Sequence, residues 1–136
     1  MILLDTSVLS LAFRRAPGPG TGSPVARTIE RLITEDVPLA VPGIVVQELL
    51  SGVRGDGQFA RLETALEGFQ VLLAERAHHV AAAKIANACR RHGVPVSTID
   101  CLIAALAVAH DAQLFTADRD FTRMTPWCGL RLLDVR

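Results

Sequence analysis

The chain has 136 residues, 50% of them hydrophobic and only 4% aromatic, so it is long enough for one domain whose core is built mainly from Leu, Val, Ile and Ala. Its 14 basic and 14 acidic residues give a net charge of zero, which argues against binding nucleic acid through bulk positive charge but leaves room for a local basic surface. The three cysteines, Cys89, Cys101 and Cys128, have no C-x-x-C spacing, so we expect neither a zinc site nor a disulfide framework, and a reduced, cytoplasmic setting fits.

The first half of the chain alternates short apolar runs with helical patterns. In order, the pattern predicts a strand at residues 2–4, a helix from 5 to about 13, a Gly/Pro/Ser-rich loop at 14–24, a helix at 25–35, a strand at 38–41, and a helix from Pro42 to about 53. No basic n-region or long apolar region occurs at the N-terminus, so no signal peptide is expected.

The second half continues the alternation. It predicts a helix at 58–67, a strand at 69–72, a helix at 75–91, a helix at 99–110, a strand at 114–116, a short helix or turn at 119–124 and a strand at 130–133. The apolar stretch 101–109 is too short to span a bilayer and is typical of a buried helix. We therefore expect an α/β protein, a three-layer α/β/α sandwich around a mostly parallel sheet, as a single domain over residues 1–136.

Two acids lie where open α/β sheets bind ligands, outside the carboxyl ends of the strands. Asp5 directly follows the first predicted strand, and Asp118 lies two residues beyond the strand ending at Thr116. Taken alone, Asp5 is as readily the N-cap of the following helix as a ligand, and Thr6 or Ser7 would cap equally well.

Asp100 and Glu48 are two further candidates. Asp100 is the only acid in the apolar helix at 99–109, where an unpaired carboxylate is costly and needs a partner or a cation. The alternative is a capping box, because Ser97 and Asp100 have the spacing that places Asp100 at the third helical position. Glu48 follows apolar residues three and four positions before it, so it borders the buried face of its helix.

The joint interpretation of these four acids is electrostatic. Carboxylates brought together repel one another, which raises their pKa values and destabilises the fold. A divalent cation reverses that effect, and hard oxygen ligands favour Mg²⁺ or Mn²⁺. Such an ion can activate a water and neutralise charge on a phosphate, so the pattern favours phosphodiester chemistry.

Four segments, in order along nearly the whole chain, resemble a PIN domain. They are LDTS at residues 4–7, VQEL at 46–49, STIDCLIAA at 97–105 and FTADRDF at 115–121. Within that group the length of the chain and the residues of these motifs are most similar to the VapC toxins of bacterial toxin–antitoxin pairs. The resemblance implies an α/β/α sandwich that cleaves RNA with Mg²⁺ or Mn²⁺ and leaves 5′-phosphate and 3′-hydroxyl ends.

The resemblance also implies site residues. The catalytic acids would be Asp5, Glu48, Asp100 and Asp118, with the metal held by Asp5, Asp100 and Asp118. Supporting positions match Thr6 and Thr116, whose hydroxyls would lie beside the metal. Asp120 is a second candidate for the fourth acid, although Asp118 is favoured because it is nearer the strand end.

Partners and nucleic-acid contacts complete the expectations. Toxins of this kind usually form homodimers, and a cognate antitoxin inhibits them by laying its C-terminal segment across the active-site groove. Seven arginines offer phosphate contacts, although most are expected to be solvated surface charges: Arg14, Arg15, Arg54, Arg90, Arg91, Arg119 and Arg123. Arg119, between the two candidate acids, is the best placed, whereas Trp127 is expected to plug the core rather than stack on a base.

Three other classes of protein fit the sequence less well. A phosphoacceptor receiver domain needs a Lys on a late strand, and the only lysine, Lys84, falls inside a predicted helix. A dinucleotide-binding domain needs G-x-G-x-x-G after the first strand, which is missing. A catalytically silent PIN-like module that binds RNA or a partner is the serious alternative, and the presence of all four acids argues against it.

Overall fold

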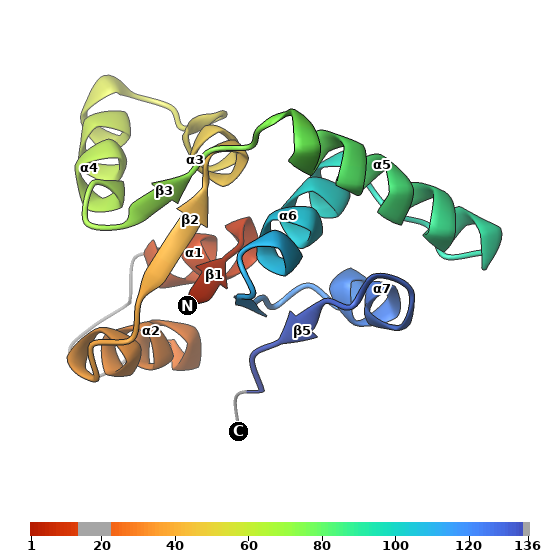
Figure 1. Cartoon of the computed structure of the whole chain (residues 1–136). Helices are drawn as coiled ribbons and strands as arrows, with labels where there is room; N and C mark the ends of the chain where they lie inside the picture. Colours follow the sequence, from red (N-terminus) through yellow and green to blue (C-terminus); the bar gives the residue numbers. More distant parts are fainter. Residues whose placement is uncertain (14–22, 135–136) are drawn as a thin grey trace.

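A parallel five-stranded sheet forms the middle layer of the protein. The computed structural model describes residues 1–13 and 23–134. In these ranges the strands are β1 (Ile2–Leu4), β2 (Leu39–Pro42), β3 (Gln70–Leu72), β4 (Gln113–Phe115) and β5 (Arg131–Leu132), arranged in the order β3-β2-β1-β4-β5 (Figure 1). Every pair is parallel, so the expected "mostly parallel" sheet is parallel throughout the described residues.

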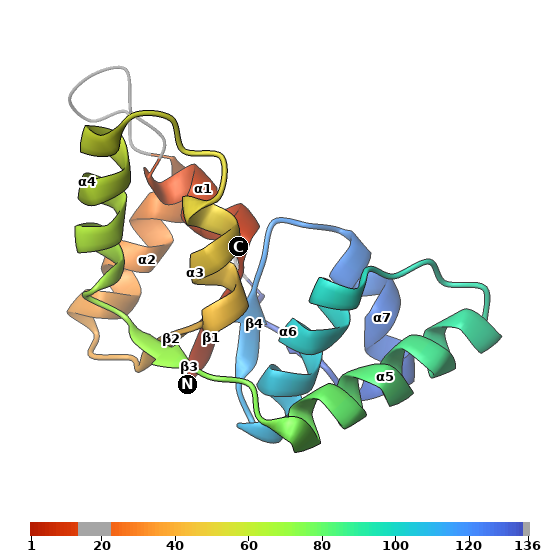
Figure 2. The same ribbon diagram turned by 90° about the horizontal axis from the view of Figure 1, so that it is seen from above.

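Helices cover both faces of this sheet. They are α1 (Thr6–Phe13), α2 (Pro24–Thr34), α3 (Gly43–Leu50), α4 (Asp56–Leu66), α5 (Arg76–Arg91), α6 (Thr98–Ala109) and α7 (Asp120–Cys128). Connections between parallel strands are right-handed, so α1–α4, which accompany the chain from β1 towards β3, lie on one face. The chain then crosses to β4 and β5 in the opposite direction, which places α5–α7 on the other face (Figure 2). The predicted three-layer α/β/α sandwich is confirmed.

The order of the strands changes direction between the neighbouring strands β1 and β4. Leu4 of β1 pairs with Phe115 of β4, so the residues that follow these two strands, Asp5 and Thr116, leave the sheet side by side. In open α/β sheets this point is where ligands bind. Two segments more than a hundred residues apart in the sequence are therefore placed together by strand register alone.

The core fills the space between the sheet and the two helical layers. Its fully buried members include Leu3 and Leu4 of β1, Leu114 of β4 and Ile103 of α6. Six residues of α6 are buried, which confirms the interpretation of the apolar stretch as an internal helix. Each fully buried Leu or Ile contributes roughly 1.5–3 kcal/mol relative to an exposed one, so this layer holds the ends of β1 and β4 in a fixed position. No helix within the described ranges is long and apolar enough to cross a bilayer.

Several predicted boundaries were wrong by a few residues. Pro42 is the last residue of β2 and the N-cap of α3, because its ψ of 142° keeps it extended and paired with Leu72. That helix ends at Leu50, before Gly52 with φ 85°, rather than near residue 53. Pro24, predicted as the last residue of the loop 14–24, is instead the first residue of α2, whose N-cap is Ser23. Residues 14–22, including Arg14 and Arg15, lie outside the described residues.

Helix α7 is longer than predicted and positions Trp127 differently. It continues through Pro126 to Cys128, and Gly129 ends it with φ 72°. Pro126 cannot donate to the carbonyl of Thr122, but the Thr125 hydroxyl donates to that oxygen at 2.9 Å. Trp127 was predicted to plug the core, which is wrong: 38% of it is exposed.

Candidate active site

One polar pocket lies at the carboxyl ends of β1 and β4. It encloses about 310 Å³ and is lined by Asp5, Thr6, Ser7, Ser10, Glu48, Asp100, Ile103 and Asp118. The four acids singled out from the sequence therefore share one pocket, although they come from the end of β1, from α3, from α6 and from the segment after β4. A larger hollow of about 520 Å³ between α1, α2 and α4 has a mostly apolar lining and none of these acids, so the polar pocket is the better candidate for chemistry.

Asp5 is the most deeply buried of these acids, with 3% of its surface exposed. Its Oδ1 accepts hydrogen bonds from the Ser7 hydroxyl at 2.6 Å and from the backbone N–H of Val8 at 3.1 Å, and its Oδ2 accepts a short one from Thr116. The Val8 bond makes Asp5 the N-cap of α1, so the capping interpretation is confirmed. A carboxylate has about four lone-pair sites, so these three bonds leave one of them, on Oδ2, for a further ligand.

Burial raises the pKa of the Asp5 carboxyl above its ordinary value, and the negative charge of Asp118 adds to this. The hydrogen bonds from Ser7, Thr116 and Val8 act in the opposite direction because they stabilise the ionised form. Asp5 is therefore a buried acid whose charge depends on a fixed set of donors.

Ser7 and Thr116 connect the ends of β1 and β4. Each hydroxyl donates to one oxygen of Asp5 and accepts from a backbone N–H beyond β4: Ala117 to Ser7 at 2.9 Å and Asp118 to Thr116 at 3.0 Å. Ser7 was considered from the sequence only as an alternative helix cap. The two-residue spacing after Asp5 is the signal that could have identified it, because a Ser there can donate back to an aspartate.

Glu48 is held from the opposite side of the pocket. Its Oε1 accepts a hydrogen bond from the Thr6 hydroxyl at 2.8 Å, and its side chain is half-buried on α3. Thr6 is the first residue of α1, so this bond ties α1 to α3 across the mouth of the pocket. The second oxygen of Glu48 accepts no hydrogen bond from the described residues, and the side chain lines the shared cavity.

Asp100 lies in the first turn of α6. The backbone N–H of Asp100 donates to the Ser97 hydroxyl at 3.0 Å, so Ser97 is the N-cap and this half of the predicted capping box is present. Burial raises the pKa of Asp100 to about 6; the charges of Asp118, Asp5 and Asp120 also raise it, while a hydrogen bond to Ser97 lowers it. The capping role and a position in the acid pocket thus coexist in one residue.

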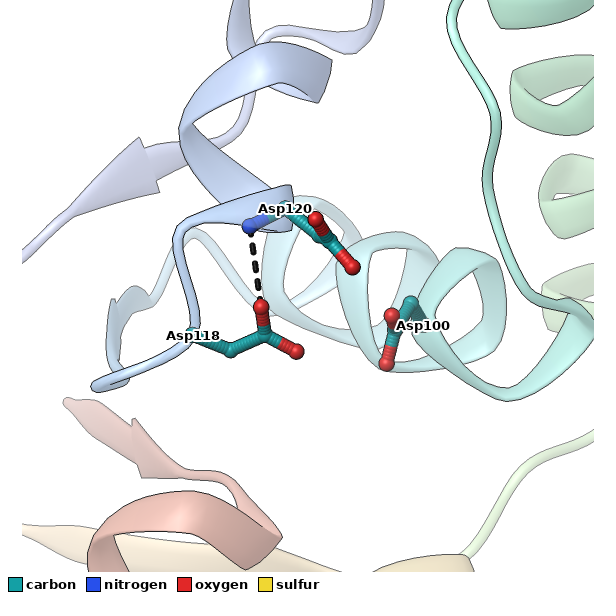
Figure 3. A group of neighbouring side chains, drawn as sticks. All are labelled: Asp100, Asp118 and Asp120. Carbon is teal, nitrogen blue, oxygen red and sulfur yellow. Dashed lines mark hydrogen bonds between the residues drawn. The ribbon is translucent and has the colours of Figure 1, made fainter.

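Asp100, Asp118 and Asp120 bring carboxylate oxygens within 4.8 Å of one another. Figure 3 shows their side chains projecting into one space: Asp100 from α6, Asp118 from the segment between β4 and α7, and Asp120 from the first residue of α7. Asp118 Oδ1 accepts the backbone N–H of Asp120 at 2.9 Å, which fixes the turn and leaves its other oxygen free of that bond. The sequence offered Asp118 and Asp120 as alternatives for the fourth acid, and the geometry allows both. Both lie beside Asp100, and Asp118 also lines the pocket with Asp5.

This donor set fits a hard divalent cation. All of its atoms are oxygens, three carboxylates lie within reach of a common centre, and no cation of the described residues forms an ion pair with Asp5, Asp100 or Asp118. Mg²⁺ and Mn²⁺ prefer such oxygen ligands and keep several waters. Asp100 and Asp118 are the two acids common to the close cluster and the pocket, with Asp5 and Asp120 on either side.

The two nearby arginines do not point into the acid pocket. Arg119 is exposed and lines a neighbouring hollow of about 300 Å³ over the ends of β4 and β5. Arg123 reaches back to Asp120 Oδ1 at 3.9 Å, in an exposed pair that contributes little to stability. Positive charge is thus available beside the acids without neutralising the pocket.

The raised pKa of Asp100 predicts how stability depends on pH in metal-free buffer. A folded-state pKa of about 6 against an ordinary value of 3.8 means that the folded state holds the proton more tightly, so this contribution is present below pH 4 and is lost as pH rises through 6. After allowance for solvent screening, it amounts to about 1 kcal/mol between pH 5 and pH 7.5, or about 3 °C in Tm.

The measurement is thermal unfolding at both pH values, compared with Asp100→Asn, which removes the titrating group. The unaltered protein should gain more on acidification than the variant does. Equal gains would show that Asp100 titrates normally.

Comparison with known proteins places this arrangement in a family. Residues 2–125 match the PIN domain family, and the chain belongs to it. More particularly, the chain is 40% identical over 124 residues to the VapC ribonuclease Mb1587 of Mycobacterium bovis, with 89% of each chain covered. The same figures hold for ribonuclease VapC11 of Mycobacterium tuberculosis strain H37Rv.

Solved structures agree on the fold. FitAcB from Neisseria gonorrhoeae superposes with a TM-score of 0.77 at 26% identity, covering 98% of this chain and 97% of that one. VapBC2 from Rickettsia felis, bound to a DNA fragment from the promoter, superposes with a TM-score of 0.80 at 22% identity over 100% of both chains. The resemblance to PIN domains and VapC proteins stated from the sequence is confirmed.

Proposed function

We propose that this chain is a metal-dependent endoribonuclease, the toxin of a toxin–antitoxin pair, that hydrolyses RNA phosphodiester bonds with Mg²⁺ or Mn²⁺. The observation that carries the proposal is the group of three carboxylates within 4.8 Å beside the buried Asp5. Its support from relatives is the 40% identity to proteins named VapC ribonucleases over 89% of the chain. A single domain over residues 1–136, working in the cytoplasm, is part of the same proposal.

Asp100, Asp118 and Asp5 are proposed to hold the cation, with Asp120 assisting. When bound, the cation would supply a lowered pKa for a nearby water and positive charge against the phosphate. The donors around Asp5 act before any substrate arrives: Ser7 and Thr116 fix both of its oxygens, so it need not reorient during the reaction.

Glu48 and Arg119 have separate proposed parts. Thr6 holds one oxygen of Glu48 and leaves the other available to the pocket, where it can accept a proton or a hydrogen bond from a substrate or water. Arg119 is exposed beside Asp118, where a guanidinium can pair with a phosphate oxygen of a bound strand. The scissile phosphate of a bound strand would then lie between the acid pocket and the Arg119 guanidinium.

The proposed partners draw on the structural neighbours. A toxin–antitoxin complex from Klebsiella pneumoniae has this fold, with a TM-score of 0.68 at 21% identity over 89% of this chain and 90% of that one. We propose a cognate antitoxin that covers the acid pocket and a homodimer as the working form of the chain.

The proposal is tested by incubating purified protein with total RNA and Mg²⁺ and mapping the new ends. We expect internal cuts with 5′-phosphate and 3′-hydroxyl ends, because water attacks phosphorus and the P–O3′ bond breaks. The 3′ oxygen leaves as a hydroxyl and the phosphate stays on the 5′ oxygen. Ends bearing a 2′,3′-cyclic phosphate would contradict the role of water, since they arise from attack by the neighbouring 2′-hydroxyl. RNA that is bound but never cut would contradict the nuclease activity and support the alternative, a catalytically silent PIN-like module.

A further inference from the structure

An aromatic pair stands on the surface at the far end of α7 from the acids. The rings of Trp127 and His92 are stacked, with centroids 3.6 Å apart and planes 14° from parallel. Both residues are exposed, and Trp127 is the only tryptophan in the chain. The pair joins α7 to the C-cap of α5, and these two helices pack side by side (Figure 2).

Both rings are held in place before any ligand binds. The His92 Nδ1 lies 2.8 Å from the carbonyl oxygen of Ala88, which can only accept, so this nitrogen carries the proton and the imidazole is fixed. On the other side, the Thr125 hydroxyl satisfies the carbonyl left open by Pro126, which keeps the last turn of α7 helical and orients Trp127. A rigid platform loses little conformational freedom when a third ring stacks on it.

The surroundings of the pair are positive, although the chain as a whole is neutral. Helices α5 and α7 carry five cations, four on α5 and one on α7, against a single acid, and the sequence has no Asp or Glu from residue 76 to 99 or from 121 to 133. Arg90 and Arg91 directly precede His92, and neither forms an ion pair with an acid of the described part of the chain. These side chains are exposed to solvent.

The pair also lies in line with the acid cluster. Asp120, one of the three clustered acids, is the first residue of α7, and Trp127 is seven positions later, about 10 Å further along the helix axis. Arg123 lies between them, one turn before Trp127 on the same face and 3.9 Å from Asp120. Along α7 the order is therefore carboxylates, Arg123 and the stacked rings, and Arg90 and Arg91 directly precede His92 in the chain.

We propose that the Trp127–His92 pair is a stacking platform for an unpaired base of single-stranded RNA, with Arg123, Arg90 and Arg91 contacting the phosphates beside it. The proposal rests on the proposed nuclease function and adds the path that the strand takes from the acids along α7. Cationic side chains beside exposed aromatic rings are how proteins bind single strands, because every base offers a face for stacking. The stacked pair is not needed to hold α5 against α7, because both helices are already anchored by buried residues: Cys89 on α5, and Phe121 and Met124 on α7.

Intrinsic fluorescence tests this directly, because the chain has one Trp and no Tyr. The Asp100→Asn protein, whose cleavage is expected to be slow, would be titrated in Mg²⁺ with a single-stranded RNA oligonucleotide of mixed sequence, while anisotropy of a dye on the RNA reports total binding. We expect the Trp127 emission to be quenched with the same midpoint as the anisotropy change, and a duplex of the same sequence to quench far less. Binding without quenching would overturn the platform, and so would the absence of any binding.

Kinetics of the unaltered pocket separate this inference from the proposed function. Trp127→Leu removes the stacking face, keeps an apolar side chain and should raise KM for a single-stranded substrate about tenfold with kcat nearly unchanged. His92→Ala, which leaves Trp127 in place, should raise KM less. The control is Phe59→Leu, an exposed aromatic on α4, on the other face of the sheet, with no expected change. An unaltered KM in both ring variants, with cleavage intact, would overturn the platform and leave the nuclease standing.

Discussion

Replacing Asp100 with asparagine is expected to slow RNA cleavage by at least about a hundredfold while raising the Tm of the metal-free protein. The loss of activity follows because Asp100 belongs both to the close group with Asp118 and Asp120 and to the pocket with Asp5. The gain in stability follows because a carboxyl whose pKa is raised to about 6 is destabilising when ionised at neutral pH, and an amide has no charge to repel its neighbours.

The two effects must be separated from loss of charge in general. Glu63→Gln removes one negative charge from an exposed position on α4, so it should leave both cleavage and Tm unchanged. Circular dichroism would show that the Asp100→Asn protein is folded, which is expected because the Ser97 cap of α6 bonds to the backbone of residue 100 and survives the change. A fully active Asp100→Asn protein would reduce Asp100 to a residue of the helix cap.

Removal of the divalent cation should abolish cleavage, and its return should restore it. Without a cation the pocket holds four acids, and no cationic side chain of the described residues forms an ion pair with them, so the negative charge of a phosphate would be repelled. With Mg²⁺ or Mn²⁺ at a hundred times its Kd, binding to the folded state alone adds about 2.7 kcal/mol of stability, which is roughly 8 °C in Tm for a chain of this size. The measurements are cleavage in EDTA, cleavage after excess Mn²⁺, and thermal unfolding in both states.

The matched control for the thermal effect is the Asp100→Asn protein. It should show a much smaller rise in Tm with Mn²⁺, because one of its proposed ligands is lost. Cleavage that is indifferent to chelation would point to a contaminating enzyme or to a reaction that needs no metal. An equal rise in Tm in both proteins would place the ion elsewhere.

Much of the fold, and the meeting of Asp5 with the segment after β4, could be predicted from the sequence, because strand register places these two segments side by side. Asp5 follows β1 directly, Thr116 follows β4, and the two strands are neighbours at the point where the chain changes direction. Once the alternation of strands and helices is recognised, the carboxyl edge of the sheet is the only place where these residues can lie.

Other features depend on tertiary contacts that no local pattern records. Ser7 became a bridge only because the backbone of Ala117 lies beside it, and Asp120 joined Asp100 only because Asp118 accepts its N–H and tightens the turn. Trp127 was expected inside, since tryptophan is usually well buried, but the short α7 stacks its ring on His92 at the surface instead. The roles of these residues in catalysis and binding stay predictions.

Locating a bound metal ion tests the central claim most directly. Crystals soaked in Mn²⁺ would be measured at an energy where manganese scatters anomalously. We predict a peak about 2 to 2.5 Å from carboxylate oxygens of Asp100 and Asp118, within reach of Asp5 or Asp120. Well-ordered density for these side chains with no such peak, at a Mn²⁺ concentration that supports full cleavage, would contradict the account.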